Sequence, residues 1–94
     1  MAGAFRVLTT PAFEREFRAI ARRNLTLTRA LEELIEILGE DPQNRGSKHQ
    51  IKKLAGLNPG EGQWRIRWRE YRLRYDIFGN EVVLHSFRHR RDAY

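Results

Sequence analysis

Arginines alternate with apolar residues along residues 64–75, a spacing suited to a sheet that binds a polyanion. Successive side chains of a β-strand point to opposite faces. The apolar face holds Trp64, Ile66 and Trp68 and is expected to be core beneath helices rather than a base-stacking surface. The other face carries arginines at four positions, namely Arg65, Arg67, Arg72 and Arg74. Guanidinium groups on neighbouring strands repel one another unless an anion lies across them, and each can grip two phosphate oxygens.

The last residues, RHRRDAY, add three arginines, a histidine and an aromatic ring to this basic face. His89, and secondarily His85, is a candidate for proton transfer because imidazole titrates near neutral pH whereas guanidinium keeps its proton. A surface or hydrogen-bonded strand position is the alternative interpretation for both histidines. Tyr94 is a candidate for stacking on an exposed base, provided that the tail is ordered.

The first half of the sequence predicts the elements that support this face. Residues 5–9 alternate as in a short strand, and Thr10-Pro11 then predicts a helix start, because Thr caps well and Pro suits the first helical position. The first helix is expected to fade at Arg23-Asn24. A second helix follows, with Gly39 placed to end it, and its apolar positions are Leu27, Leu31, Leu34, Ile35 and Leu38.

The second half predicts a sheet. Residues 40–50 form a polar loop, residues 51–57 fit either a helical turn or a short extended piece, and residues 58–62 form a turn. Two strands from Trp64 onward are predicted to form a hairpin with its turn near Arg69-Glu70. Tight hairpin turns usually have Gly or Asn at the positions with positive φ, and neither residue is present there. Gly79-Asn80 leads into a buried strand over residues 81–87. The expected fold is a single α+β domain over residues 1–94 with the order β-α-α-β-β-β, a small antiparallel sheet and a helical hairpin packed on one face.

Composition supports a basic binding domain. The chain has 94 residues and a net charge of +6. All of the excess falls after residue 47, where eleven Lys/Arg face five Asp/Glu, which is typical of a footprint for phosphates. There is no cysteine, and no apolar run approaches the ~20 residues that span a bilayer. We therefore expect a cytoplasmic protein without a membrane partner, a metal or a cofactor.

The run WRIRWREYRLRYDIFGNEVVLHSFRHRRDAY, preceded by Lys53-Leu54-Ala55-Gly56-Leu57, resembles the RelE/ParE toxin superfamily of type II toxin–antitoxin systems, and most of all its RelE-like branch. The resemblance covers nearly the whole chain, since the predicted element order matches too. It implies a ribosome-dependent endoribonuclease that cuts messenger RNA and inhibits translation. It also implies a cognate antitoxin that wraps the toxin, with a possible toxin–antitoxin hetero-oligomer, and the ribosome and mRNA as further partners.

Carried over by position, the resemblance implies five catalytic residues: Arg65, Arg67, Arg72, Arg90 and Tyr94. Ribonuclease members often have Lys at the first two positions, whereas this chain has Arg, and a guanidinium is a poor general base. The identity of the residue that accepts the proton therefore stays open, with His89 as the candidate. Auxiliary RNA contacts are expected from further basic residues, namely Lys48, Lys52, Lys53, Arg69, Arg74, Arg88 and Arg91. Two alternatives remain: a ParE-like inhibitor of DNA gyrase without nuclease activity, and a catalytically silent domain that binds only RNA or an antitoxin.

Overall fold

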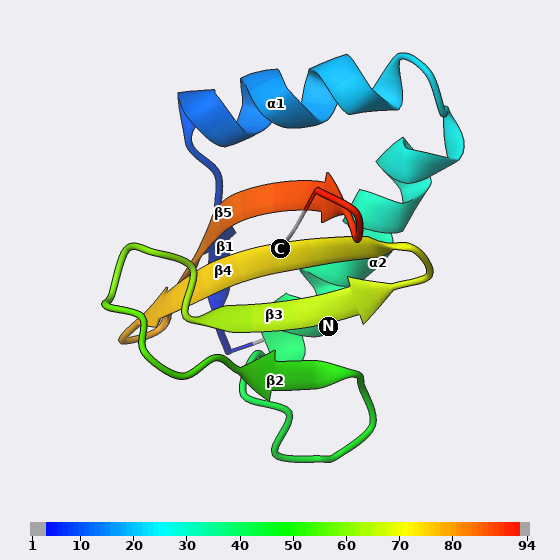
Figure 1. Ribbon diagram of the computed structural model, residues 1–94. Coiled ribbons are helices and arrows are strands. Elements are labelled where there is room, and N and C mark those ends of the chain that lie inside the picture. Colours follow the sequence, from blue (N-terminus) through cyan, green and yellow to red (C-terminus); the bar gives the residue numbers. More distant parts are fainter. Residues whose placement is uncertain (1–3, 93–94) are drawn as a thin grey trace.

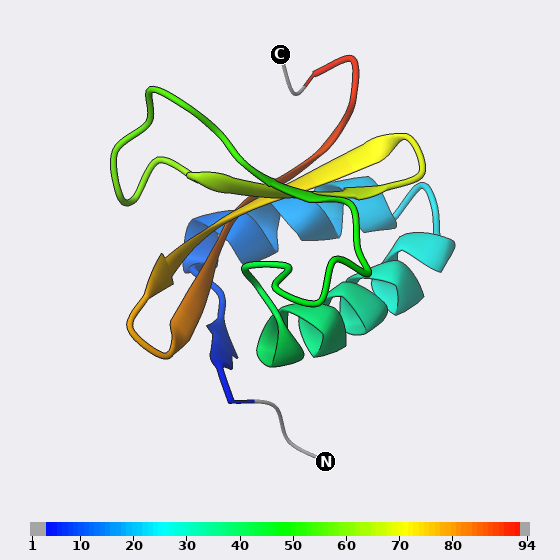
Figure 2. The same ribbon diagram turned by 90° about the horizontal axis from the view of Figure 1, so that it is seen from below.

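The computed structural model describes residues 4–92 as an α+β fold in which two helices lie on one side of a five-stranded sheet (Figures 1 and 2). In chain order the elements are β1 (Arg6–Leu8), α1 (Pro11–Ala21), α2 (Thr26–Glu40), β2 (Ile51–Lys53), β3 (Trp64–Trp68), β4 (Tyr71–Phe78) and β5 (Glu81–His89). The predicted fold class and the packing of the helical hairpin on one face are confirmed.

The sheet has the order β1-β5-β4-β3-β2 and is mixed rather than wholly antiparallel. Strands β2 to β5 pair antiparallel, as short hairpin connections require, but β1 lies parallel to β5, with Arg6 opposite Glu81. No short turn joins β1 to β5, so their relative direction follows from the path of the whole chain. Residues 51–53 form β2, an edge strand additional to the four that were expected, so the extended alternative for this segment is the correct one.

Both helices form where their apolar spacing predicts, although one of the predicted ends is wrong. The Thr10 side chain accepts a hydrogen bond from the Phe13 N–H at 3.0 Å, and Pro11 occupies the first turn, so the predicted helix start is confirmed. Gly39 does not end α2, which continues to Glu40. Phe5 N donates to the Gly39 carbonyl oxygen at 3.0 Å, which ties the residue before β1 to the last turn of α2. A Cβ on Gly39 would lie 3.7 Å from the Phe5 carbonyl oxygen, an ordinary contact distance, so the position has room for a side chain.

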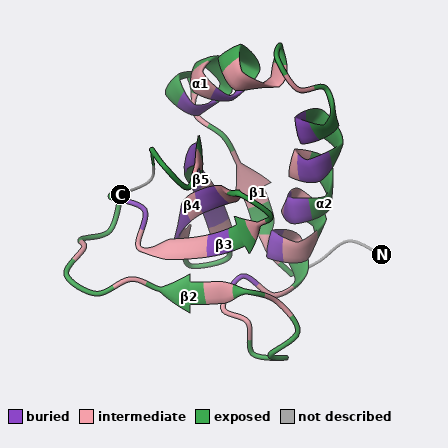
Figure 3. Cartoon of the chain, turned by 45° about the vertical axis from the view of Figure 1, so that its right-hand side comes forward, coloured by how far each residue is buried: buried purple, intermediate pink, exposed green. Residues whose placement is uncertain are grey.

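The core fills the space between the helices and the sheet (Figure 3). The buried side of α2 faces the sheet, where the central strands β4 and β5 supply fully buried residues such as Leu73, Tyr75 and Phe87. Trp64 and Trp68 are half-buried and pack against this core, as predicted for the apolar face. Tyr75 also donates its hydroxyl hydrogen to the Pro42 carbonyl oxygen at 2.7 Å, and burial raises the pKa of this phenol.

The helix-free side of the sheet, hereafter the open face, is where the alternation places the arginines. The loop of residues 54–63 and the chain after β5 both lie toward this side (Figure 2). The β3–β4 turn at its edge is made without glycine, because Arg69 itself adopts a φ of +53°. Among residues 4–92, neither helix combines the length and the apolar character that a membrane crossing requires.

Candidate nucleic-acid interface

Strand register gathers the predicted arginines into two rows across the open face. One row runs from Lys52 through Arg65 and Arg74 to Ser86. The other consists of Arg67, Arg72 and Arg88 on β3, β4 and β5. Directly opposed residues of an antiparallel pair have Cβ atoms ~4.5–5.5 Å apart, so each row concentrates positive charge within reach of one nucleic-acid backbone.

Arg72 at the centre of the second row is buried, with 5% of its surface exposed. The sequence places Arg72 on the polar side of the sheet and so predicts that its side chain projects into solvent; this prediction is wrong. One terminal nitrogen, Nη1, donates to the carbonyl oxygens of Arg69 and Tyr71 at 3.1 and 3.0 Å, which folds the guanidinium back over the β3–β4 turn. Among the described residues no carboxylate pairs with Arg72, and its buried Nε has no hydrogen-bond partner.

Arg74 is held by the loop before β3. Its Nε donates to the Gly62 carbonyl oxygen at 3.1 Å, and its Nη2 donates to the carbonyl oxygen of Glu61. The buried carboxylate of Asp76 anchors the same loop by accepting the Gly62 and Gln63 N–H groups at 2.9 and 3.0 Å. Arg74 is thus partly a structural residue. The sequence interpretation missed Asp76, although a lone acid in a strand of arginines was a usable signal.

The arginines at the end of the chain have acidic neighbours. Arg88 Nε lies 3.2 Å from Glu16 Oε1 on α1, and Arg90 Nε lies 2.7 Å from Glu70 Oε2 in the β3–β4 turn. Arg91 is exposed. Tyr94, predicted to stack on a base, lies outside the described residues.

The structure separates the two candidate histidines. The ring of His89 packs edge-on against Tyr71 at 5.4 Å, and Tyr71 stacks on the core residue Phe87, so His89 lies on the helix side of the sheet. His89 Nδ1 also accepts the Arg91 N–H at 3.2 Å. His85 is exposed and lies beside Gly62 and Arg74 on the open face. The structure therefore brings His85, and not His89, together with the arginine rows.

The predicted auxiliary residues fall on both sides of the sheet. Lys52 belongs to the first row, whereas Lys53 lies over the Trp64 ring at 5.6 Å and Arg69 over the Trp68 ring at 4.8 Å. Both rings belong to the helix-facing side, and these contacts have the geometry of cation–π pairs. Lys48 is exposed in the loop before β2. That loop is shaped by Asp41, whose pKa is lowered because its carboxylate accepts the N–H groups of Gly46 and Arg45.

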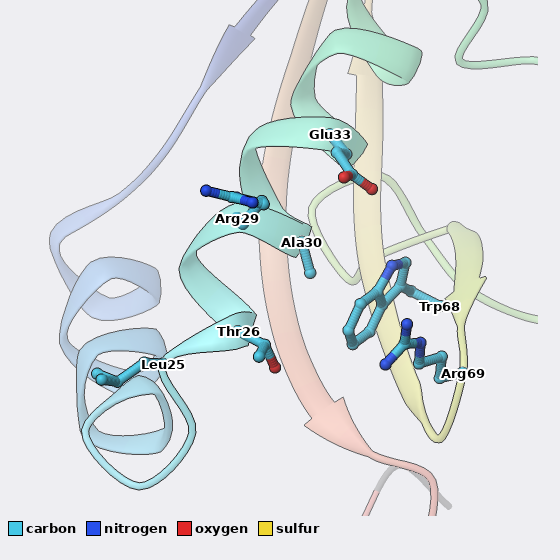
Figure 4. A pocket seen from close by; sticks show the side chains of 7 residues that line it. All are labelled: Leu25, Thr26, Arg29, Ala30, Glu33, Trp68 and Arg69. Carbon is cyan, nitrogen blue, oxygen red and sulfur yellow. The ribbon is translucent and has the colours of Figure 1, made fainter.

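A hollow of about 420 Å³ lies on the helix side, between the start of α2 and the end of β3 (Figure 4). Trp68 and Ala30 form its apolar part, and Leu25, 83% exposed, stands beside it. Charged groups on its rim come from α2 and the turn, namely Arg29, Glu33 and Arg69. Within the described part of the chain, no three His, Asp or Glu side chains gather in a way that could hold a metal ion.

Comparisons with known proteins agree with the fold. One solved structure, a chain from the crystal structure of the RelB–RelE antitoxin–toxin complex of Methanococcus jannaschii, is similar with a TM-score of 0.55 and 21% identity. The match covers 93% of this chain and 94% of that one, and it establishes the fold. No curated protein matches the sequence. The sequence does match, over residues 7–94, the family described as ParE toxin of type II toxin–antitoxin system, parDE. The chain therefore belongs to the ParE toxin family of type II toxin–antitoxin systems.

Proposed function

We propose that this toxin is a RelE-like endoribonuclease that cuts messenger RNA on the ribosome. The observation that carries the proposal is Arg72, a buried arginine with no carboxylate partner among the described residues and with a buried Nε that has no hydrogen-bond partner. A buried charge is costly unless it is paired. A phosphate would supply both the opposite charge and the missing acceptor. Arg67 lies beside Arg72 on β3, whereas Arg88 beside it on β5 directs its guanidinium to Glu16.

The two arginine rows suit the chemistry of RNA self-cleavage. The 2′-hydroxyl attacks its neighbouring phosphorus in line, so the protein must orient the backbone and stabilise charge that grows on the phosphate oxygens. Arginine provides paired donors that stay protonated at neutral pH. Arg72 is fixed by its contacts to the turn, whereas Arg67 is exposed and can follow the substrate. In this proposal Arg65, Arg67, Arg72 and Arg90 hold phosphate, and Tyr94 stacks on a base.

The second candidate is a poison of DNA gyrase, which the ParE family match favours. One pair of assays separates the two functions. Translation in vitro, followed by primer extension on the message, reports cleavage, and a gyrase supercoiling assay reports inhibition of the topoisomerase. Cleaved message with normal supercoiling supports the ribonuclease. Intact message with blocked supercoiling supports the gyrase poison instead. If the protein neither cuts the message nor blocks supercoiling, it is a domain that binds its partner without either activity.

RNA binding is expected to weaken steeply with salt. Each phosphate contact to a single strand contributes a slope of ~0.7 log unit of affinity per log unit of salt, because binding releases condensed counterions. Arg67→Ala should lower the measured slope by about that amount. Arg29→Ala, on an exposed position of α2 across the sheet, is the matched control and should leave the slope unchanged. A flat salt dependence for the parent protein would remove the polyanion proposal altogether.

An antitoxin partner is expected to neutralise the open face. A peptide with acidic side chains would relieve the repulsion within the arginine rows and block phosphate from entering them, or it would displace the tail. Co-expression with an acidic antitoxin encoded beside this chain should restore growth and yield a stoichiometric complex. If such a complex still arrests translation, the antitoxin acts elsewhere and the account of inhibition is wrong.

A further inference from the structure

His85 occupies an irregular position on the last strand. Arg74 pairs with Ser86 and Tyr75 pairs with Leu84, so the register shifts and His85 is the extra residue between them. At such a bulge two residues of one strand oppose a single residue of the other, and the side chain of the extra residue is re-aimed. Leu84 before it is fully buried in the core, whereas His85 is exposed. The bulge therefore places two consecutive residues, His85 and Ser86, on the open face.

The anchored loop fits closely around this histidine. Gly62 has a φ of +77°, and a Cβ built on it would lie 3.1 Å from His85 Cγ and 3.0 Å from Arg74 Nε. The hydrogen bonds from the Gly62 and Gln63 N–H groups to the buried Asp76 fix the loop at this point. His85, Arg74 and the Gly62 backbone thus form one packed group at the end of the first arginine row.

The proposed reaction needs a group that the arginines cannot provide. Attack by the 2′-hydroxyl is faster when a neutral base takes its proton, and a guanidinium stays protonated. The chain has three histidines. His89 packs against Tyr71 on the other side of the sheet, and the backbone of His49 is held by Asn44 in the loop before β2, with bonds of 2.7 and 3.1 Å. His85 is the histidine that shares the open face with the arginine rows.

We propose that His85 accepts the proton of the attacking 2′-hydroxyl, an inference that rests on the proposed ribonuclease function. The O2′–P bond forms as the P–O5′ bond breaks, and an imidazole nitrogen takes the 2′-hydroxyl proton. The departing 5′ oxygen takes a proton from solvent water, and the imidazolium returns its own proton to solvent. The products are a 2′,3′-cyclic phosphate and a 5′-hydroxyl. No oxidant, metal or further reactant enters the balance.

Charged groups of both signs surround this position. Arg74 on β4 is next to it, and Arg65 and Lys52 continue the same row on β3 and β2. The negative groups are Asp76, which is turned toward the loop N–H groups, and Glu61, whose Oε1 accepts the Asn58 N–H at 2.6 Å. Both carboxylates are engaged with backbone donors. A phosphate bound across the arginine rows would lie beside the imidazole rather than beside a carboxylate.

The test is single-turnover cleavage on message-programmed ribosomes, followed between pH 6 and 8 with the full chain. His85→Gln is expected to slow the chemical step by about 10²- to 10⁴-fold and to abolish the fall in rate on the acid side of neutrality, with ribosome binding unchanged. His85→Ala with added imidazole should recover part of the rate, which a purely structural role would not allow. His89→Gln and His49→Gln are matched controls and should keep both the parental rate and the pH profile.

The outcomes distinguish this inference from the proposed function. If the parent protein does not cut message at all, both fail together. If the parent cuts and His85→Gln cuts at the same rate with the same acid limb, the assignment of His85 is overturned while the ribonuclease function stands. Thermal unfolding of His85→Gln should match that of the parent, since the side chain is exposed. If the His85→Gln variant is unstable, the role of His85 is tested by adding imidazole to the His85→Ala variant. Failure of imidazole to restore cleavage overturns the inference.

Discussion

Replacing Arg72 by alanine is expected to slow message cleavage by about 10²- to 10³-fold, the usual cost of removing one group that stabilises developing charge in a transition state. Arg72 is also buried, so the substitution should destabilise the fold. It leaves the carbonyl oxygens of Arg69 and Tyr71 without their donor, which costs about 1 to 3 kcal/mol of unfolding free energy. Cleavage on programmed ribosomes and thermal unfolding should therefore be measured on the same preparations.

Two further variants separate catalysis from folding. Arg72→Lys keeps the charge and much of the stem but loses the fork that grips two oxygens, so it should fold better than Arg72→Ala and still cleave poorly. Arg90→Ala removes an exposed arginine whose pair with Glu70 is worth at most about 1 kcal/mol, so lost cleavage there reports function. Glu70→Ala breaks the same pair and keeps the arginine, and it should stay active. A folded Arg72→Ala protein that cleaves message at the parental rate would contradict the assignment of Arg72 as a catalytic residue.

Leu34→Ala is expected to act through the core alone. Leu34 is 2% exposed on the sheet-facing side of α2, and truncating such a residue costs about 2 to 5 kcal/mol, from lost burial and from the cavity left behind. Small domains have only ~5 to 15 kcal/mol of total stability, so this variant approaches the unfolding threshold. Leu25→Ala, at the N-cap position just before the same helix and 83% exposed, should change stability by less than about 0.5 kcal/mol.

Urea unfolding of both leucine variants gives the comparison directly. Leu34→Ala should shift the midpoint sharply with little change in slope, because two-state unfolding exposes nearly the same surface. Equal stabilities for Leu34→Ala and Leu25→Ala would contradict the placement of α2 over the sheet.

Features governed by neighbouring residues were predictable from the sequence. The start of α1 depends on a cap three residues from its partner, and the Gly79 turn depends on one residue with a φ of +59°. The alternation from Trp64 onward likewise separated the core side of β3 and β4 from the arginine side, because period-two patterning is a property of each strand alone.

Features that depend on distant residues were not predictable in this way. The parallel pairing of β1 with β5 follows from the path of the whole chain. The burial of Arg72 depends on a turn in which an arginine adopts a positive φ. The bulge opposite Arg74 changes the side of the sheet on which His89 lies, since one extra residue changes the face of everything beyond it. Alternation from Leu84 alone would put both His85 and His89 on the open face, whereas the observed register leaves His85 there and moves His89 to the helix side.

The pairing of the first strand with the last has a consequence for synthesis. Arg6 leaves the ribosome long before Glu81, and at ~5 to 20 residues per second the delay between them is on the order of 4 to 15 s. Contacts this distant in sequence also form slowly, because a long loop must close before they are made. The nascent toxin therefore passes through an interval in which its helices have emerged but its sheet is incomplete. During that interval the arginines of β3 and β4 lack Arg88, their neighbour on β5, so the basic surface is complete only after synthesis has passed β5.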